Sequence, residues 1–192
     1  MFNKIMKLSN GVEIPQLALG TWLIGDDQVA EAVRAAVEIG YTHIDTAQAY
    51  ANERGVGEAI RTCGVSREKL FVTTKVAAEH KDYRTAADGI DKSLRTMELD
   101  YIDMMIIHCP QPWAKVNQSD DRYYEGNLEA WRALTDAYQA GKLRAVGVSN
   151  FLKEDIENIW SHAEVKPMVN QVLCLGITAF VLVFAENGDK SL

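Results

Sequence analysis

Residues 40–50 read Gly-Tyr-Thr-His-Ile-Asp-Thr-Ala-Gln-Ala-Tyr, and they carry the pattern that decides the fold of this chain. Gly40 follows an amphipathic run with apolar residues every three or four positions, which is where a glycine ends a helix. The next residues, His43 to Asp45, have the length and character of a short buried strand. A helix that ends in glycine and leads into such a strand is one step of an alternating α/β fold.

The same alternation continues along the chain, with Gly64 and Gly141 again placed between a helical pattern and a strand-like run. The strand-like runs are continuous rather than alternating, which is typical of a parallel sheet covered on both faces. These runs are Leu17 to Leu19, His43 to Asp45, Leu70 to Thr74, Ile102 to Ile107, Ala145 to Val148 and Val169 to Val172. An open doubly wound sheet and a closed barrel both fit this order. On the helical faces we expect Trp131 and Trp160 in the core.

Two further segments stand outside the alternation. Asn10-Gly11, between short strand-like pieces, predicts a hairpin that serves as a plug or lid. Residues 111–126 form the one long irregular connection and are a candidate functional loop. No proline- or serine-rich linker and no repeat divides the chain, so we expect residues 1–192 to form a single domain.

Composition excludes several classes of function. The 192 residues contain 20 Lys and Arg against 27 Asp and Glu, a net charge of −7 without a basic stripe, which argues against nucleic-acid or anionic-membrane partners. The longest nearly apolar run, residues 172–185, is too short for a membrane-spanning helix of about 20 residues. The chain starts without an apolar signal region, and its three cysteines are far apart. A reducing cytoplasm is therefore the expected location.

Reactive side chains follow the predicted strands. Asp45, Lys75 and His108 each end a strand-like run, and Tyr50 comes shortly after Asp45. In a parallel barrel the carboxyl ends of all strands meet on one face, so these residues would converge there. Their spacing fits no metal site, and we expect no metal.

The chemistry of this set points to carbonyl reduction. A tyrosine with a pKa of about 10 is a poor acid near neutral pH unless a cation stabilises its phenolate. Lys75 beside Tyr50 supplies that cation, Asp45 holds the ammonium in place, and His108 is suited to hydrogen-bond a substrate carbonyl. The set contains no nucleophile, so the difficult step needs a cofactor, and hydride transfer from a nicotinamide fits.

At this point the sequence resembles the aldo-keto reductase family. The resemblance extends over residues 7 to 171 and rests on several motifs in order: residues 40–50 with the following Asn52-Glu53 and 56–60, Lys75 after a strand, residues 99–103 leading to Ile107-His108, and residues 141–151. It implies a (β/α)8 barrel of the TIM type with an N-terminal β-hairpin, and NADPH-dependent reduction of small-molecule aldehydes or ketones.

The resemblance also assigns roles to individual positions. It implies that Tyr50 is the proton donor, that Lys75 and Asp45 tune it, and that His108 orients the carbonyl. It further implies a cofactor site for NADPH and an aromatic substrate pocket. The cofactor site comprises Thr21, Asp45, Ser149, Asn150 and Gln171, and the pocket residues are Trp22 and Trp113.

The resemblance stops after Gln171. About six βα units precede that point, and residues 172–192 form a divergent tail where the family has two more units. We interpret the chain as a truncated or frameshifted member with an incomplete barrel. Residues 179–185 are uncharged, β-prone and free of proline, so we expect them to pair with the exposed sheet edge or to drive aggregation. The alternative function is a catalytically inactive fragment or interaction protein that does not bind NADPH productively.

Overall fold

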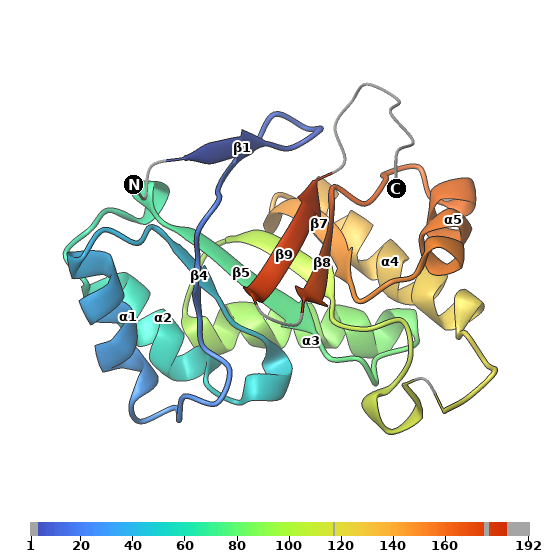
Figure 1. The fold of residues 1–192 in the computed structure, drawn as a ribbon, viewed down its shortest axis with the longest axis horizontal. Helices are drawn as coiled ribbons and strands as arrows, with labels where there is room; N and C mark the ends of the chain where they lie inside the picture. The colour runs from blue at the N-terminus through green and yellow to red at the C-terminus, as the bar shows by residue number, and fades with distance from the viewer. Residues whose placement is uncertain (1–3, 117, 175–176, 184–192) are drawn as a thin grey trace.

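The main sheet has seven strands and keeps the order of the sequence (Figure 1). The computed structural model describes residues 4–116, 118–174 and 177–183. The strands of this sheet are β3 (Leu19–Gly20), β4 (His43–Asp45), β5 (Phe71–Val76), β6 (Ile102–Ile107), β7 (Leu143–Ser149), β8 (Val169–Cys174) and β9 (Ile177–Val183). Neighbours from β3 to β8 pair in parallel, whereas β9 pairs antiparallel with β8.

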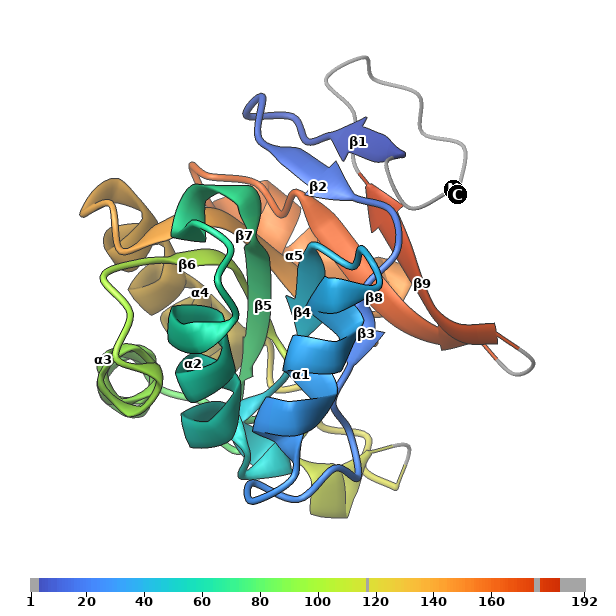
Figure 2. The same ribbon diagram turned by 90° about the vertical axis from the view of Figure 1, so that its left-hand side faces the viewer.

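A helix follows each parallel strand from β3 to β7. The helices are α1 (Val29–Glu38), α2 (Glu53–Thr62), α3 (Tyr83–Met97), α4 (Tyr124–Gln139) and α5 (Lys153–His162). Figure 2 shows α1, α2 and α3 side by side along one side of β4 and β5, with β8 and β9 toward the other side. Six parallel strands with their helices confirm the expected incomplete (β/α)8 barrel.

The glycine pattern that indicated this alternation has a backbone cause. Gly40 follows α1 with φ 106°, and Gly141 follows α4 with φ 76°. Residues with a Cβ rarely adopt these φ angles, so glycine lets the chain leave the helix and turn back toward the next strand.

The two central strands are buried along their whole length. Every residue of β5 and β6 is buried, and Ile106 and Ile107 at the end of β6 have no exposed surface. Because both faces are covered, the sequence of these strands does not alternate between apolar and polar residues.

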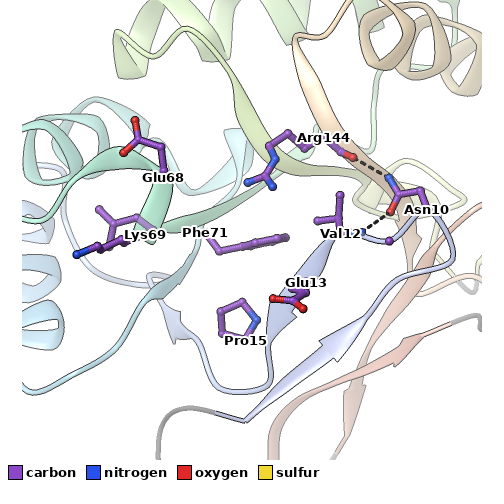
Figure 3. Close-up of a pocket in the computed structure, with 10 residues that line it drawn as sticks. Asn10, Val12, Glu13, Pro15, Glu68, Lys69, Phe71 and Arg144 are labelled. Atoms are coloured by element: carbon purple, nitrogen blue, oxygen red, sulfur yellow. Dashed lines mark hydrogen bonds between the residues drawn. The ribbon is translucent and has the colours of Figure 1, made fainter.

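The N-terminal hairpin closes the end of the sheet at which the parallel strands begin. It consists of β1 (Ile5–Lys7) and β2 (Glu13–Pro15). The side-chain amide of Asn10 donates to the main-chain carbonyl of Arg144, near the start of β7, at 2.9 Å. A cleft of about 500 Å3 remains between the hairpin and the first residues of β5 and β7, lined by Glu13, Phe71 and Arg144 among others (Figure 3). The hairpin is therefore a plug at the amino ends of the strands.

A buried carboxylate organises the same end of the sheet. Asp103 in β6 is fully buried and accepts hydrogen bonds from Arg67 at 2.6 Å, from Arg144 at 2.7 Å and from the main-chain N–H of Val72 at 2.9 Å. One side chain thus joins β5, β6 and β7 where the strands begin.

The expected strand in the tail is present in the described residues. Strand β9 pairs with β8 in a register that sets Val169 opposite Val183 and Gln171 opposite Val181. This confirms pairing with the sheet edge, while residues 184 and 185 of the predicted segment lie outside the described residues.

Two expectations from the sequence need correction. The first barrel strand is β3 at Leu19–Gly20 rather than a run from Leu17, whose side chain is 45% exposed. Trp160 is 42% exposed and not in the core. Its neighbour Ile159 points inward, and one further residue along a helix rotates the side chain by about 100°, which moves Trp160 off the buried stripe.

The Asp103 cluster gives a prediction for stability. Substitution of Asp103 by Ala leaves Arg67 and Arg144 without their buried counter-charge, so we expect the free energy of unfolding to fall by about 3–5 kcal/mol. Urea denaturation followed by circular dichroism measures the loss. The control is Asp91→Ala, which removes the half-exposed ion pair with Lys142 and is expected to cost less than about 1 kcal/mol. Equal losses in both variants would contradict this role of Asp103.

Candidate active site

The reactive side chains predicted from the sequence lie at the carboxyl ends of neighbouring strands. Asp45 is the last residue of β4, Lys75 is the next to last of β5, and His108 follows β6 directly. Tyr50 reaches the same place from the segment after β4, and Ser149 ends β7. The site therefore occupies the end of the sheet opposite to the hairpin.

Lys75 is the centre of this arrangement. Its side chain is 2% exposed, and its Nζ lies 2.5 Å from Oδ1 of Asp45. The same ammonium donates to the main-chain carbonyl of Thr46 at 2.8 Å and to the hydroxyl of Tyr50 at 3.5 Å. An ammonium has three protons to donate, and each is directed to one of these oxygens.

Tyr50 is held by the short helix η1 (Gln48–Tyr50). The side-chain amide of Gln48 donates to the carbonyl of Gly89 at 2.9 Å and to the hydroxyl of Ser93 at 3.0 Å, both in α3. Its oxygen accepts the main-chain N–H of Ala77 at 2.8 Å. These bonds fix the turn that presents the Tyr50 hydroxyl to Lys75.

Asn52 joins the segment that carries Tyr50 to the segment after β3, a role that was not predicted from the sequence. Its side chain is fully buried and donates to the carbonyls of Thr21 and Ile24, both at 2.9 Å, while its oxygen accepts from the hydroxyl of Thr46 at 2.7 Å. A polar residue directly before a helix within residues 40–60 was the available signal, because a buried amide must find several partners.

His108 lies between two aromatic rings. Its imidazole is 5.6 Å from the ring of Tyr50 and 4.9 Å from that of Trp113, measured between centroids, and both contacts are edge to face. Burial, together with the nearby Lys75 ammonium, lowers the pKa of His108 from 6.5 to about 3. Nδ1 of this ring is buried without a hydrogen-bond partner among the described residues. The imidazole is therefore neutral near neutral pH.

A set of amide and hydroxyl groups lies beside His108. The Ser149 hydroxyl donates to the main-chain carbonyl of Gln171 at 2.7 Å, and the side-chain amide of Asn150 donates to the carbonyl of His108 at 3.1 Å. Oε1 of Gln171 is buried and has no partner within the described part of the chain. An unpaired buried acceptor suits a ligand that brings an N–H donor, such as a carboxamide.

The remaining predicted residues take different places. Thr21 is fully buried, and its hydroxyl donates to the carbonyl of Asp45 at 3.2 Å. Trp22 follows β3 and is 65% exposed. Trp113 begins the short helix η3 (Trp113–Lys115), is 42% exposed, and reaches the site through its contact with His108.

The site has the groups for moving a proton under the control of a buried cation.

Within residues 4–116, 118–174 and 177–183, no three His, Cys, Asp or Glu side chains form a group that could hold a metal ion. In the same part of the chain, no helix combines the length and the apolar character needed to cross a membrane.

The Aldo/keto reductase family model matches residues 16–177 of the chain. The chain is 44% identical to the glyoxal reductase of Bacillus subtilis over 168 residues, which cover 87% of this chain and 56% of that protein. It is 36% identical to the methylglyoxal reductase DkgA of Escherichia coli over 168 residues, covering 88% of this chain and 57% of that protein. The chain thus spans little more than half the length of these relatives.

Solved structures of aldo/keto reductases also match this chain. An aldo/keto reductase from Brucella melitensis superposes with a TM-score of 0.82 and 35% sequence identity, covering 91% of this chain and 63% of that one. An aldo-keto reductase from Bombyx mori, solved in complex with NADP, superposes with a TM-score of 0.77 and 34% identity, covering 91% of this chain and 59% of that one.

The low pKa of His108 gives a prediction for the pH dependence of stability. Between pH 6.5 and about 3 the unfolded chain binds a proton at this residue and the folded chain does not. The contribution of His108 to stability is therefore complete above pH 6.5 and is lost as the pH falls toward 3. The free energy of unfolding in urea should be measured at pH 7 and at pH 5. Between these two pH values it should fall less for His108→Gln than for the unaltered chain. An equal loss would mean that this imidazole titrates normally.

Proposed function

The chain belongs to the aldo/keto reductase family, and from this premise we propose that it reduces aldehydes or ketones to alcohols with hydride from NADPH. In this proposal Tyr50 is the proton donor, Lys75 and Asp45 tune its acidity, and His108 orients the carbonyl. The observation that carries the proposal is the buried Lys75 ammonium, held by Asp45 at 2.5 Å and directed at the Tyr50 hydroxyl.

The proton step follows from these contacts. Tyr50 gives its hydroxyl proton to the carbonyl oxygen as that oxygen gains negative charge, which leaves a phenolate. The Lys75 ammonium stabilises the phenolate, and the Asp45 carboxylate balances its charge in a site with little water. The reaction therefore needs no strong acid from solution.

His108 acts in the proposal as a neutral hydrogen-bond donor. Because its pKa is about 3, the ring does not compete with Tyr50 as the acid near neutral pH. Through Nε2 it donates to the same carbonyl oxygen and holds the substrate with the reacting carbon next to the cofactor site. The ring of Trp113 packs against the imidazole at 4.9 Å, and His108 is buried from water.

The cofactor site proposed for NADPH comprises Ser149, Asn150 and Gln171, with Thr21 and Asp45 beside them. When bound, NADPH supplies the hydride that the side chains of this chain cannot provide. The unpaired Oε1 of Gln171 supports the proposal, since it offers an acceptor for the carboxamide N–H of a nicotinamide. The Bombyx mori structure, solved with NADP, supports the choice of cofactor.

Small reactive carbonyls are the proposed substrates. The relatives named as glyoxal and methylglyoxal reductases support this class. The exposed Trp22 and Trp113 fit an aromatic wall around a small aldehyde. The free thiols of Cys63 and Cys109 suit a reducing compartment, and we propose that the reaction takes place in the cytoplasm.

Cofactor binding separates the proposed enzyme from the alternative, an inactive fragment or interaction protein. We expect the purified chain to bind NADPH saturably, because the groups that suit the carboxamide are retained. Titration with NADPH while protein fluorescence is followed measures this binding, with NADH as the comparison. Absence of saturation would favour the alternative.

The proposed proton donor gives a prediction for activity. Tyr50→Phe removes the hydroxyl beside Lys75, so kcat for methylglyoxal reduction should fall at least about 100-fold while the Kd for NADPH changes less than about twofold. The oxidation of NADPH, followed by its absorbance, measures the rate. The control is Tyr138→Phe, which removes a hydroxyl near Asn10 at the opposite end of the sheet and should leave kcat unchanged. Normal turnover by Tyr50→Phe would exclude Tyr50 as the acid.

A further inference from the structure

A long loop between β6 and α4 forms one side of the candidate active site. It begins at Cys109, directly after His108, and ends at Tyr123, directly before α4. Within it η3 carries Trp113, whose ring contacts the imidazole of His108 at 4.9 Å. The position of this aromatic side chain over the site therefore depends on what holds the loop.

A lysine outside the loop binds its first residue. The Nζ of Lys81, from the segment between β5 and α3, donates to the main-chain carbonyl of Cys109 at 2.8 Å and to Oδ1 of Asn127 at 2.7 Å. Burial lowers the pKa of Lys81 to about 8. Burial of a lysine destabilises the fold unless its N–H groups find hydrogen-bond acceptors.

Asn127 extends this contact to the far end of the loop. Its side chain is 1% exposed, and its Nδ2 donates to the carbonyl of Pro110 at 2.9 Å and to the carbonyl of Arg122 at 3.2 Å. One amide group thus joins the second residue of the loop to the next to last. Lys81 and Asn127 together form a clamp across the stem of the loop.

The interior of the loop is held separately. The side-chain amide of Gln111 donates to the carbonyls of Ser119 at 2.9 Å and Asp121 at 2.7 Å. Arg122 forms an ion pair with the buried carboxylate of Asp155 in α5, with Nε 3.0 Å from Oδ1. These bonds tie the loop to itself and to α5, while the clamp fixes the stem at Cys109, Pro110 and Arg122.

We propose that Lys81 and Asn127 are positioning residues that set substrate affinity by clamping the stem of the loop that holds Trp113 over the active site. This inference rests on the proposed reductase function, since it concerns the substrate of that site. Neither residue touches the reacting groups. They act through the loop on the contact between Trp113 and His108. That contact shapes the pocket in which a small carbonyl substrate would bind.

Three variants separate the parts of the clamp. Lys81→Met removes the ammonium and both of its bonds at similar side-chain length. Asn127→Asp keeps an acceptor for Lys81 but removes the N–H donors that join Pro110 to Arg122. Lys81→Arg retains a cation with several donors and should rescue part of the function. The matched control is Lys69→Met, an exposed lysine beside the first residues of β5.

Two measurements follow the clamp in the full chain. The first is the rate of trypsin cleavage after Lys115, an exposed residue of η3, which reports opening of the loop whether or not the chain turns over. The second is steady-state kinetics with methylglyoxal and NADPH. We expect cleavage in Lys81→Met and Asn127→Asp to be about tenfold faster, and KM to rise about three- to tenfold while kcat stays within twofold. For Lys81→Arg, both the cleavage rate and KM should lie between the values of these variants and those of the unaltered chain.

Each outcome decides the proposal. Faster cleavage together with a higher KM supports it. Unchanged cleavage in both variants overturns the clamp, and faster cleavage with an unchanged KM overturns its role in substrate affinity. If the unaltered chain binds NADPH but reduces no carbonyl while cleavage still depends on Lys81 and Asn127, the proposed function fails and the clamp stands. A similar change in Lys69→Met would assign the effect to charge alone and overturn the proposal.

Discussion

A lysine ammonium that has lost almost all contact with water is stable only if its charge is balanced and its protons find acceptors. Lys75 meets both conditions, but its acceptors come from different segments: Asp45 ends β4, Thr46 starts the following loop, and Tyr50 ends η1. The pairing of β4 with β5 brings these segments within reach. The contacts of Gln48 and Asn52 then maintain the loop against α3 and the segment after β3. The chemical site and the local fold are thus one arrangement, since loss of the ion pair would disturb both.

The two ends of the parallel sheet bury different polar groups. Where the strands begin, Asp103 is enclosed by two arginines, and all of its partners belong to the chain. Where the strands end, Oε1 of Gln171 and Nδ1 of His108 are buried without partners in the described residues. The unpartnered atoms of Gln171 and His108 lie at the carboxyl ends of the strands, which is the face of a parallel barrel that carries reactivity.

Much of this arrangement was predictable from the sequence. Continuous apolar runs ending in Asp45, Lys75 and His108 indicated parallel strands with a site at their carboxyl ends, and α/β alternation gave their order. Residue types do not reveal contacts with the main chain. Acceptors such as the Thr46 carbonyl, and side chains such as Asn127 whose partners are main-chain carbonyls, were therefore not predictable from the sequence. Trp160 shows a further limit, since neighbouring apolar residues on a helix point in directions about 100° apart. The assignment of residues 1–192 to one domain, and the roles of the site residues, stay predictions.

The direction of β9 determines which part of the chain faces the chemistry. Every parallel strand from β3 to β7 delivers its carboxyl end, and the segment that follows, to the rim of the site. Strand β9 runs the other way, and Val183 at its carboxyl end lies opposite Val169 at the amino end of β8. It therefore extends the wall of the sheet, and its own carboxyl end lies at the end of the sheet opposite to that rim. Among the described residues the rim is therefore asymmetric: loops and helices follow β4 to β7 on one side, and on the other side β8, which carries Gln171, is paired with a strand that runs back along the sheet.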